Sequence, residues 1–226
     1  MAGIYAVITG DIIRSTRYST DIWRELNKAI KAAFDELHDL FRADLHSNFE
    51  LFRGDSFQCA IKNPRIALRL IILLISLLRV KSGSIVKEDP LKAKIAIGIG
   101  GINYLKKGSS ESMGEAFQYS GDLLDAIRSR DRQKIQIRSP WEEINGELMT
   151  GVALLEALIN RWSLEQAEAM IQHLLGLKQI EIADRLGISQ PAVVHRLHLA
   201  GSWAVDLLLK RYDFIMDARL GRIVDY

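Results

Sequence analysis

Residues 52–58 read Phe52-Arg53-Gly54-Asp55-Ser56-Phe57-Gln58, a glycine and an aspartate between two short apolar runs. Two such runs separated by Gly-Asp predict a tight β-hairpin, because glycine tolerates the backbone conformation of a two-residue turn. We therefore expect strands at about 48–53 and 56–61. Asp55 alone could be a turn residue, since aspartate is common in hairpin turns.

The segments on either side of this hairpin alternate between strand-like and helix-like patterns. Before it, an apolar run over residues 4–8 ends at Gly10-Asp11, and apolar spacing of three and four predicts a helix over 20–42. After it come a helix opened by Pro64, a strand over 92–101, a helix over 114–128 and a strand over 134–137. The predicted order is β-α-β-β-α-β-α-β, which indicates an α+β fold of the ferredoxin-like type.

The pattern changes after Ser139-Pro140, where helical periodicity dominates from 148 to 214 and no further strand is predicted. We expect a domain boundary near 139–150, with an N-terminal domain over residues 1–140 and an all-α domain over residues 141–226.

Composition sets the broad class of the protein. The chain has 226 residues and is 48% hydrophobic, which is enough for a sizeable core. The single cysteine, Cys59, excludes an internal disulfide framework and favours a cytoplasmic location. The most apolar run, residues 66–78, is shorter than the ~20 residues that span a bilayer, so no membrane partner is expected. The densest basic run, residues 128–138, fits a solvated face about as well as a phosphate site.

Two aspartates are the candidate site. In a β-α-β-β-α-β core, Asp11 at the end of the first strand and Asp55 in the hairpin turn should meet at one end of the sheet. Two adjacent carboxylates repel unless they share a proton or a divalent cation such as Mg²⁺ or Mn²⁺. We expect Asp11, Ile12 and Asp55 to hold the metal. Backbone N–H groups and hydroxyls of the following stretch would contact a nucleotide through Ile13, Arg14, Ser15 and Thr16.

Three motifs carry a resemblance. Residues 11–16 (Asp-Ile-Ile-Arg-Ser-Thr), residues 52–57 and the glycine-ended run over 95–100 resemble the class III nucleotidyl cyclase and GGDEF palm-type domain, over about residues 3–138. Within this type, the sequence resembles the SatD family. The resemblance implies that Asp11 and Asp55 hold metal ions and are the catalytic carboxylates if the protein is an enzyme. It also implies that the helix beginning at 114 carries the groups that act on the transition state.

The sequence departs from this family at positions needed for turnover. The asparagine of the cyclases falls on Gln118, the arginine four residues later falls on Asp122, and the second acid of GGDEF falls on Ser56. An acid at the arginine position opposes stabilisation of phosphoryl charge. The resemblance therefore implies an intact metal pair, Gln118 as a nucleotide contact and an incomplete catalytic set.

Residues 176–200 have the spacing of a helix-turn-helix and resemble region 4 of sigma factors. Ala183 permits close contact, Gly187 supplies a left-handed helix end, and Val193 buries against the first helix. In the second helix, from 190 to about 200, Gln190, Val194 and His195 should face the groove of double-stranded DNA. Ser189, Arg196 and Lys178 should lie near phosphates. Residues 151–226, however, contain nine acidic residues and eight Lys or Arg residues. Because DNA-binding domains are usually basic, a protein-interaction module is the alternative.

The sequence thus leads to two functional hypotheses. The first is a DNA-binding transcriptional regulator whose N-terminal domain senses a nucleotide or a metal–nucleotide ligand. It would be a homodimer, for which Trp203, Ala204, Leu207 and Leu208 form a candidate seam. The second is a metal-dependent nucleotidyl cyclase or nucleotidyltransferase. A third possibility reduces both domains to binding modules, with the carboxylates serving only as turn formers.

Overall fold

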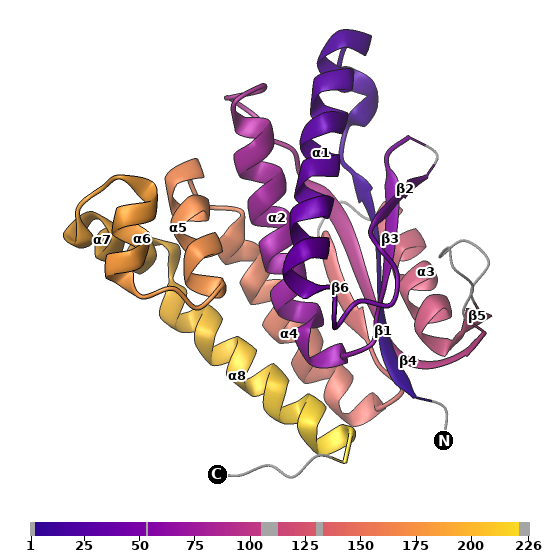
Figure 1. Ribbon diagram of the computed structural model, residues 1–226. Coiled ribbons are helices and arrows are strands. Elements are labelled where there is room, and N and C mark those ends of the chain that lie inside the picture. Colours follow the sequence, from indigo (N-terminus) through magenta and orange to yellow (C-terminus); the bar gives the residue numbers. More distant parts are fainter. Residues whose placement is uncertain (1–2, 53, 105–112, 130–132, 222–226) are drawn as a thin grey trace.

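A computed structural model of the chain describes residues 3–52, 54–104, 113–129 and 133–221. Its sheet has the order β2-β3-β1-β4-β5, with β6 pairing β4 beside this path (Figure 1). All neighbouring strands are antiparallel except β4 and β6, which are parallel. The bounds are β1 Ile4–Ile12, β2 Glu50–Phe52, β3 Ser56–Ile61, β4 Ala93–Tyr104, β5 Met113–Gly114 and β6 Ile135–Arg138.

Eight α-helices accompany the sheet within the described residues. They are α1 Thr20–Phe41, α2 Ala67–Gly83, α3 Glu115–Arg128, α4 Glu142–Ile159, α5 Leu164–Leu174, α6 Gln179–Leu186, α7 Gln190–Ala200 and α8 Ser202–Arg219, with 3₁₀ turns η1 Ser15–Arg17 and η2 Pro64–Ile66. The predicted combination of strands and helices is confirmed at this coarse level, as a largely antiparallel sheet with many helices. The observed order adds the two-residue β5 to the predicted elements, and every described element after β6 is a helix.

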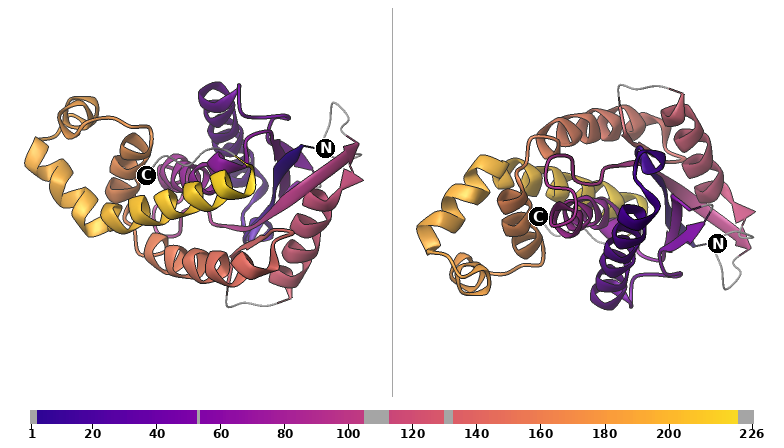
Figure 2. Two further views of the ribbon diagram at one scale, coloured as in Figure 1. Left: turned by 90° about the horizontal axis from the view of Figure 1, so that it is seen from below. Right: turned by 90° about the horizontal axis from the view of Figure 1, so that it is seen from above.

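Helices α1 and α2 cover one face of the sheet, and α3 covers the other (Figures 1 and 2). On the α3 face, Thr9 of β1 donates a hydrogen bond to Ser120 of α3, 3.0 Å away and buried. Helix α3 also lies against Gly98 of β4, where an added Cβ would come within 2.1 Å of the Ala116 carbonyl oxygen. Glycine at 98 is what lets helix and strand approach this closely.

The chain direction fixes which end of α3 reaches which end of the sheet. Strand β4 starts beside the end of β1, where Ala93 pairs with Ile12, and β6 starts beside Ile95. Because β6 is parallel to β4, α3 must run back between them. Its last turn therefore lies at the end of the sheet where β1 ends.

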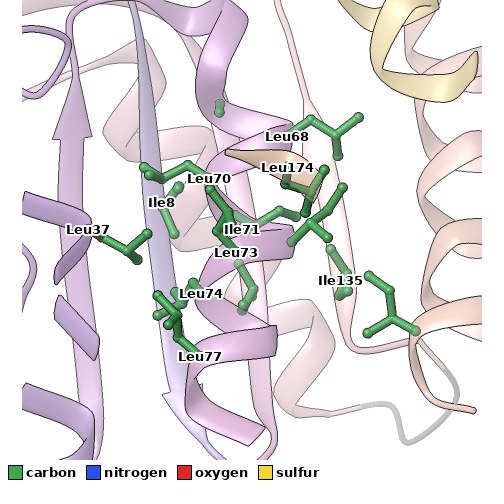
Figure 3. Close-up of a cluster of buried hydrophobic side chains, with 14 of the residues drawn as sticks. Ile8, Leu37, Leu68, Leu70, Ile71, Leu73, Leu74, Leu77, Ile135 and Leu174 are labelled. Atoms are coloured by element: carbon green, nitrogen blue, oxygen red, sulfur yellow. The ribbon is translucent and has the colours of Figure 1, made fainter. Parts of the chain in front are cut away.

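Helix α2 is the centre of the core. Its side chains are buried on nearly every side, which accounts for its continuous apolar sequence. Ile71 and Leu74 lie among Ile8 of β1, Leu37 of α1 and Leu174 of α5 (Figure 3). None of the helices within the described ranges is long and apolar enough to cross a membrane.

Both halves of the chain contribute to this one core. The Tyr212 hydroxyl of α8 donates to the Pro64 carbonyl oxygen at 2.8 Å, and the buried Arg79 guanidinium donates to the Trp162 carbonyl oxygen. The buried Glu156 carboxylate of α4 accepts hydrogen bonds from the backbone N–H groups at 134 and 135, at 2.9 and 3.0 Å. The predicted boundary region, 139–150, covers the connection after β6 and the first half of α4, and the division into two domains stays a prediction.

Helices α6 and α7 are joined by residues 187–189, with the local features expected from the sequence. Gly187 ends α6 in the left-handed conformation (φ 65°), and the Ser189 hydroxyl accepts a hydrogen bond from the Ala192 N–H at 3.3 Å. Ala183 and Val193 are buried between the two helices.

Candidate functional site

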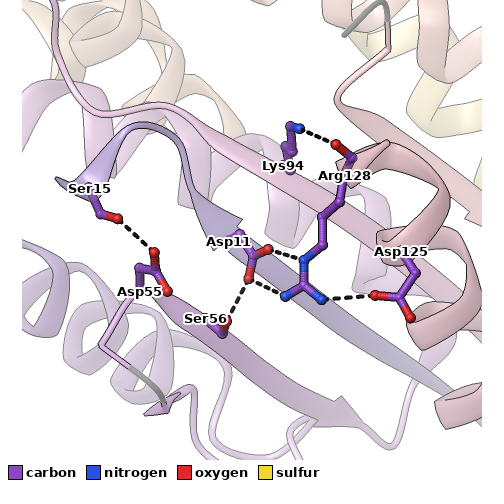
Figure 4. Close-up of polar contacts among 7 residues, drawn as sticks. All are labelled: Asp11, Ser15, Asp55, Ser56, Lys94, Asp125 and Arg128. Atoms are coloured by element: carbon purple, nitrogen blue, oxygen red, sulfur yellow. Dashed lines mark hydrogen bonds and ion pairs between the residues drawn. The ribbon is translucent and has the colours of Figure 1, made fainter. Parts of the chain in front are cut away.

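Asp11 and Asp55 lie at the same end of the sheet (Figure 4). Asp11 pairs with Ser56 of β3 on one side and with Lys94 of β4 on the other. Asp55 precedes β3 in a turn where Gly54 has φ 93°. The Ile12 N–H donates to the Asp55 carbonyl oxygen at 3.0 Å, which fixes the turn against β1. Arg53, the remaining residue of this turn, lies outside the described residues.

A serine hydroxyl orients each carboxylate. Ser56 donates to Asp11 Oδ1 at 2.6 Å, and Ser15 of η1 donates to Asp55 Oδ2 at 2.6 Å (Figure 4). Hydrogen bonds of this length to a carboxylate are strong because the acceptor is charged. Among the described residues, the Asp55 carboxylate is hydrogen-bonded through Oδ2 to Ser15 alone, so its Oδ1 stays available to a ligand.

The two aspartates line one open pocket of about 660 Å³. Its walls come from residues 11–18, from the turn at 55, from the start of β4, and from the ends of the α3–β6 connection; the lining residues are Asp11, Ile12, Ile13, Arg14, Ser15, Thr16, Arg17, Tyr18, Asp55, Asp89, Pro90, Lys92, Lys94, Arg128 and Lys134. The predicted nucleotide contacts at 13–16 are thus brought together with both aspartates. Gln118 is not: it is exposed on α3 and does not line this pocket.

Basic side chains outnumber acidic ones in the pocket by six to three. Asp89 is neutralised, because Arg17 lies 2.6 Å and Lys92 3.0 Å from its oxygens. The hydrogen bond from Lys92, followed by that from Arg17, lowers the pKa of Asp89. The pKa of Arg17 is raised by its hydrogen bonds to Tyr18 and Asp89. The excess positive charge suits a polyanion such as a chain of phosphates.

Arg128, which the sequence indicates only as the start of a basic run, contacts Asp11 directly. Its guanidinium holds Asp11 with two hydrogen bonds, Nε to Oδ2 at 2.5 Å and Nη2 to Oδ1 at 2.9 Å, and holds Asp125 through Nη1 at 2.8 Å. The hydrogen bond to Asp11 raises the pKa of Arg128. Lys94 Nζ donates to the Arg128 carbonyl oxygen at 3.3 Å. In the basic run over 128–138, Arg130 and Arg132 lie outside the described residues.

The donor set limits which metal the pocket could hold. No group of three or more His, Cys, Asp or Glu side chains gathers for a metal among the described residues. Two carboxylates therefore remain, Asp11 and Asp55. Mg²⁺ is commonly bound by one or two carboxylates together with substrate phosphates and water, so the pair fits such an ion when a phosphate ligand completes the coordination. The Ile12 side chain is buried, so only its backbone carbonyl oxygen could take the predicted role in metal binding.

The residues predicted to contact DNA lie on and beside α7. Lys178, Ser189, Gln190, Val194 and His195 are exposed. Arg196 is half-buried instead, with its guanidinium 3.6 Å from Glu168 of α5. The predicted phosphate contact of Arg196 would therefore require it to leave this ion pair.

The predicted homodimer seam is partly open to solvent. Trp203 and Leu207 of α8 are 68% and 63% exposed, and Leu154 of α4 is exposed beside them. These residues line an apolar groove of about 690 Å³ between α4 and α8, together with Ala204 and Leu208. Whether a second copy of the chain covers it stays a prediction.

Comparisons with known proteins give only remote likenesses. No protein-family model matches the chain, and no curated protein matches it. Among solved structures it is similar to a bacterial light-regulated adenylyl cyclase (15% identity over 61% of this chain and 76% of that chain, TM-score 0.43) and to the guanylyl cyclase Cya2 (17%, 61% and 77%, TM-score 0.38). It is also similar to a dimeric guanylyl cyclase domain of a RhoGC fusion protein from the aquatic fungus Blastocladiella emersonii (17%, 55% and 74%, TM-score 0.41). At these TM-scores the likeness carries no argument about function, which must come from the pocket.

Proposed function

We propose that the pocket binds a nucleoside triphosphate together with Mg²⁺ or Mn²⁺ and performs phosphoryl chemistry of the nucleotidyl cyclase or nucleotidyltransferase type. The observation that carries the proposal is the meeting of Asp11 and Asp55 on the wall of a pocket whose basic side chains outnumber its acidic ones. A polyphosphate suits the basic walls, and a divalent cation relieves the repulsion of the two carboxylates.

Each part of the pocket has a role in this proposal. Asp11 and Asp55 hold the cation, and Ser56 and Ser15 keep their carboxylates oriented. The segment 13–16 and the basic walls bind the phosphates. When bound, the cation would neutralise charge that develops on the phosphates during transfer. Two finer assignments belong to this proposal. The ferredoxin-like palm domain of the SatD family rests on the predicted element order and on the sequence resemblance, and the homodimer rests on the candidate seam of α8.

Asp55→Asn should weaken metal-dependent nucleotide binding by about 100-fold or more, because loss of even an indirect partner of a metal costs about 10–100-fold in affinity. Calorimetric titration of each of the four common nucleoside triphosphates in Mn²⁺ would measure this. Asp89→Asn is the matched control. It removes an acid from the same pocket and frees Arg17 and Lys92, so it should not weaken binding. Equal affinities of wild type and Asp55→Asn would contradict the proposal.

The same proteins separate an enzyme from a sensor. Product formed by the wild type and lost in Asp55→Asn identifies catalysis. Binding that depends on Asp55 but yields no product with any nucleotide leaves a sensor domain.

A second candidate function is DNA binding through α6 and α7, favoured by the exposure of Gln190, Val194 and His195 at the start of α7. In it, the nucleotide would modulate a transcriptional regulator. Duplexes selected from a random pool would supply the target. Gln190→Ala should then lower affinity about tenfold, since a contact to a base edge contributes ~1–3 kcal/mol. Lys210→Ala, an exposed cation on α8, is the control and should leave affinity unchanged. Failure to enrich any duplex would remove this candidate.

A further inference from the structure

We propose that Arg128 is a phosphate-binding residue of this pocket and that it exchanges partners: it holds Asp11 in the empty site and the phosphates of the ligand in the filled one. This inference rests on the proposed function and deepens it. It concerns the one basic residue of the pocket that binds a predicted metal carboxylate.

The contacts of Asp11 make the two states exclusive. Arg128 engages both carboxylate oxygens, and Ser56 adds a third hydrogen bond at Oδ1. A divalent cation on Asp11 would take positions now held by the guanidinium and would lie a few ångströms from its positive charge. Like charges at that distance repel. Metal alone should therefore bind weakly while Arg128 stays in place.

Arg128 is nevertheless able to leave. The Arg128 side chain is 42% exposed, and that of its second anchor, Asp125, is 75% exposed, so water screens the ion pair between them. The Asp11 side chain is only 17% exposed, so its carboxylate needs a new positive partner when Arg128 leaves. The planar guanidinium binds phosphate in the same two-pronged manner as carboxylate. A triphosphate with its cation can thus replace the pair, because the phosphates bind Arg128 and the cation binds Asp11.

The position of Arg128 keeps the released group within the pocket. It is the last residue of α3, beside Lys94, and both line the pocket with Lys134. A phosphate in front of Asp11 would therefore be within reach of three cations. Arg128 supplies from the end of α3 the charge that Asp122 cannot supply from the middle of the same helix. Phosphate and metal then increase each other's affinity: phosphate draws Arg128 away from Asp11, and metal on Asp11 releases Arg128 for phosphate.

The test is a pair of titrations with opposite expected signs. For Arg128→Gln, calorimetry should show Mn²⁺ alone binding about tenfold more tightly than to wild type. Inorganic tripolyphosphate alone should bind about tenfold more weakly. Lys94→Gln is the matched control, since it removes a neighbouring cation that has no carboxylate partner among the described residues. It should weaken tripolyphosphate binding without the gain for Mn²⁺.

The opposite signs distinguish this role from a structural one. If Arg128 only stabilised the fold, its loss would weaken both ligands or neither, and that result overturns the inference. A circular dichroism melt of Arg128→Gln that matches wild type shows that the fold is retained. If the wild type binds metal and nucleotide through Asp55 but Arg128→Gln lacks the opposite shifts, only this inference fails. If the wild type binds neither Mn²⁺ nor tripolyphosphate, separately or together, the proposed function fails with it.

Discussion

Gly98→Ala should lower the free energy of unfolding by about 2–3 kcal/mol, toward the upper end for overpacking a close contact. The new Cβ would come within 2.1 Å of the Ala116 carbonyl oxygen and 2.6 Å of the Ser120 nitrogen. Both are backbone atoms of α3, so no side-chain rotation relieves the clash, and the whole helix must move away from β4. Urea denaturation followed by circular dichroism measures the loss.

Gly101→Ala is the matched control on the same strand. A Cβ at 101 would have no atom within 4 Å, and alanine restricts the unfolded chain more than glycine does. The control should therefore be as stable as wild type or slightly more so. If Gly98→Ala were as stable as Gly101→Ala, α3 could not pack against β4 as closely as described.

Ile71→Ala should cost about 2–5 kcal/mol, because truncating a fully buried aliphatic side chain leaves a cavity. Ile71 is 0% exposed in α2, with core residues of both halves of the chain around it. Leu154→Ala removes a comparable side chain from an exposed position on α4 and should change stability by less than about 0.5 kcal/mol. Thermal and urea unfolding of the three proteins give the comparison.

The shared core also leads us to expect one unfolding transition for the two halves. Variants that keep only Trp23 of α1 or only Trp162, which is buried in the helical half, report on the halves separately. Their fluorescence midpoints should coincide, as they do for a cooperative unit. Two separate transitions would instead support residues 141–226 as an independently folding domain.

Most elements could be predicted from local pattern, and the errors have local causes. The helix predicted over 20–42 is observed as Thr20–Phe41, because its apolar spacing is regular. The apolar run predicts a first strand over 4–8 that Gly10-Asp11 ends, whereas β1 continues to Ile12 because β3 and β4 pair with it on both sides. Gly10 lies within the strand and leaves room for the Phe57 ring, because a Cβ at this position would lie 2.3 Å from that ring.

The sequence could predict only those contacts of the candidate site that join segments close together in the chain. The hairpin places Asp55 next to β1, so its proximity to Asp11 follows from the order of the first strands. Arg128 follows Asp11 by 117 residues in the sequence. Its approach to Asp11 depends on the parallel pairing of β6 with β4. The basic run that begins at Arg128 gives no sign of this approach. Trp203 was predicted in a candidate dimer seam, but its helical spacing equally fits a packed side chain, so the pattern alone did not decide its 68% exposure.

The direction of α3 has an electrostatic consequence for the pocket. The aligned peptide dipoles give the C-terminal end of a helix about half a negative elementary charge, and the last residue of α3, Arg128, lines the pocket. Many phosphate sites gain attraction from a helix N-terminus, whereas here the C-terminal end of α3 would repel an anion, and the basic side chains of the pocket must overcome this repulsion. Because attraction between exposed charges weakens as counterions accumulate, capture of a polyanion by this protein should be governed by ionic strength.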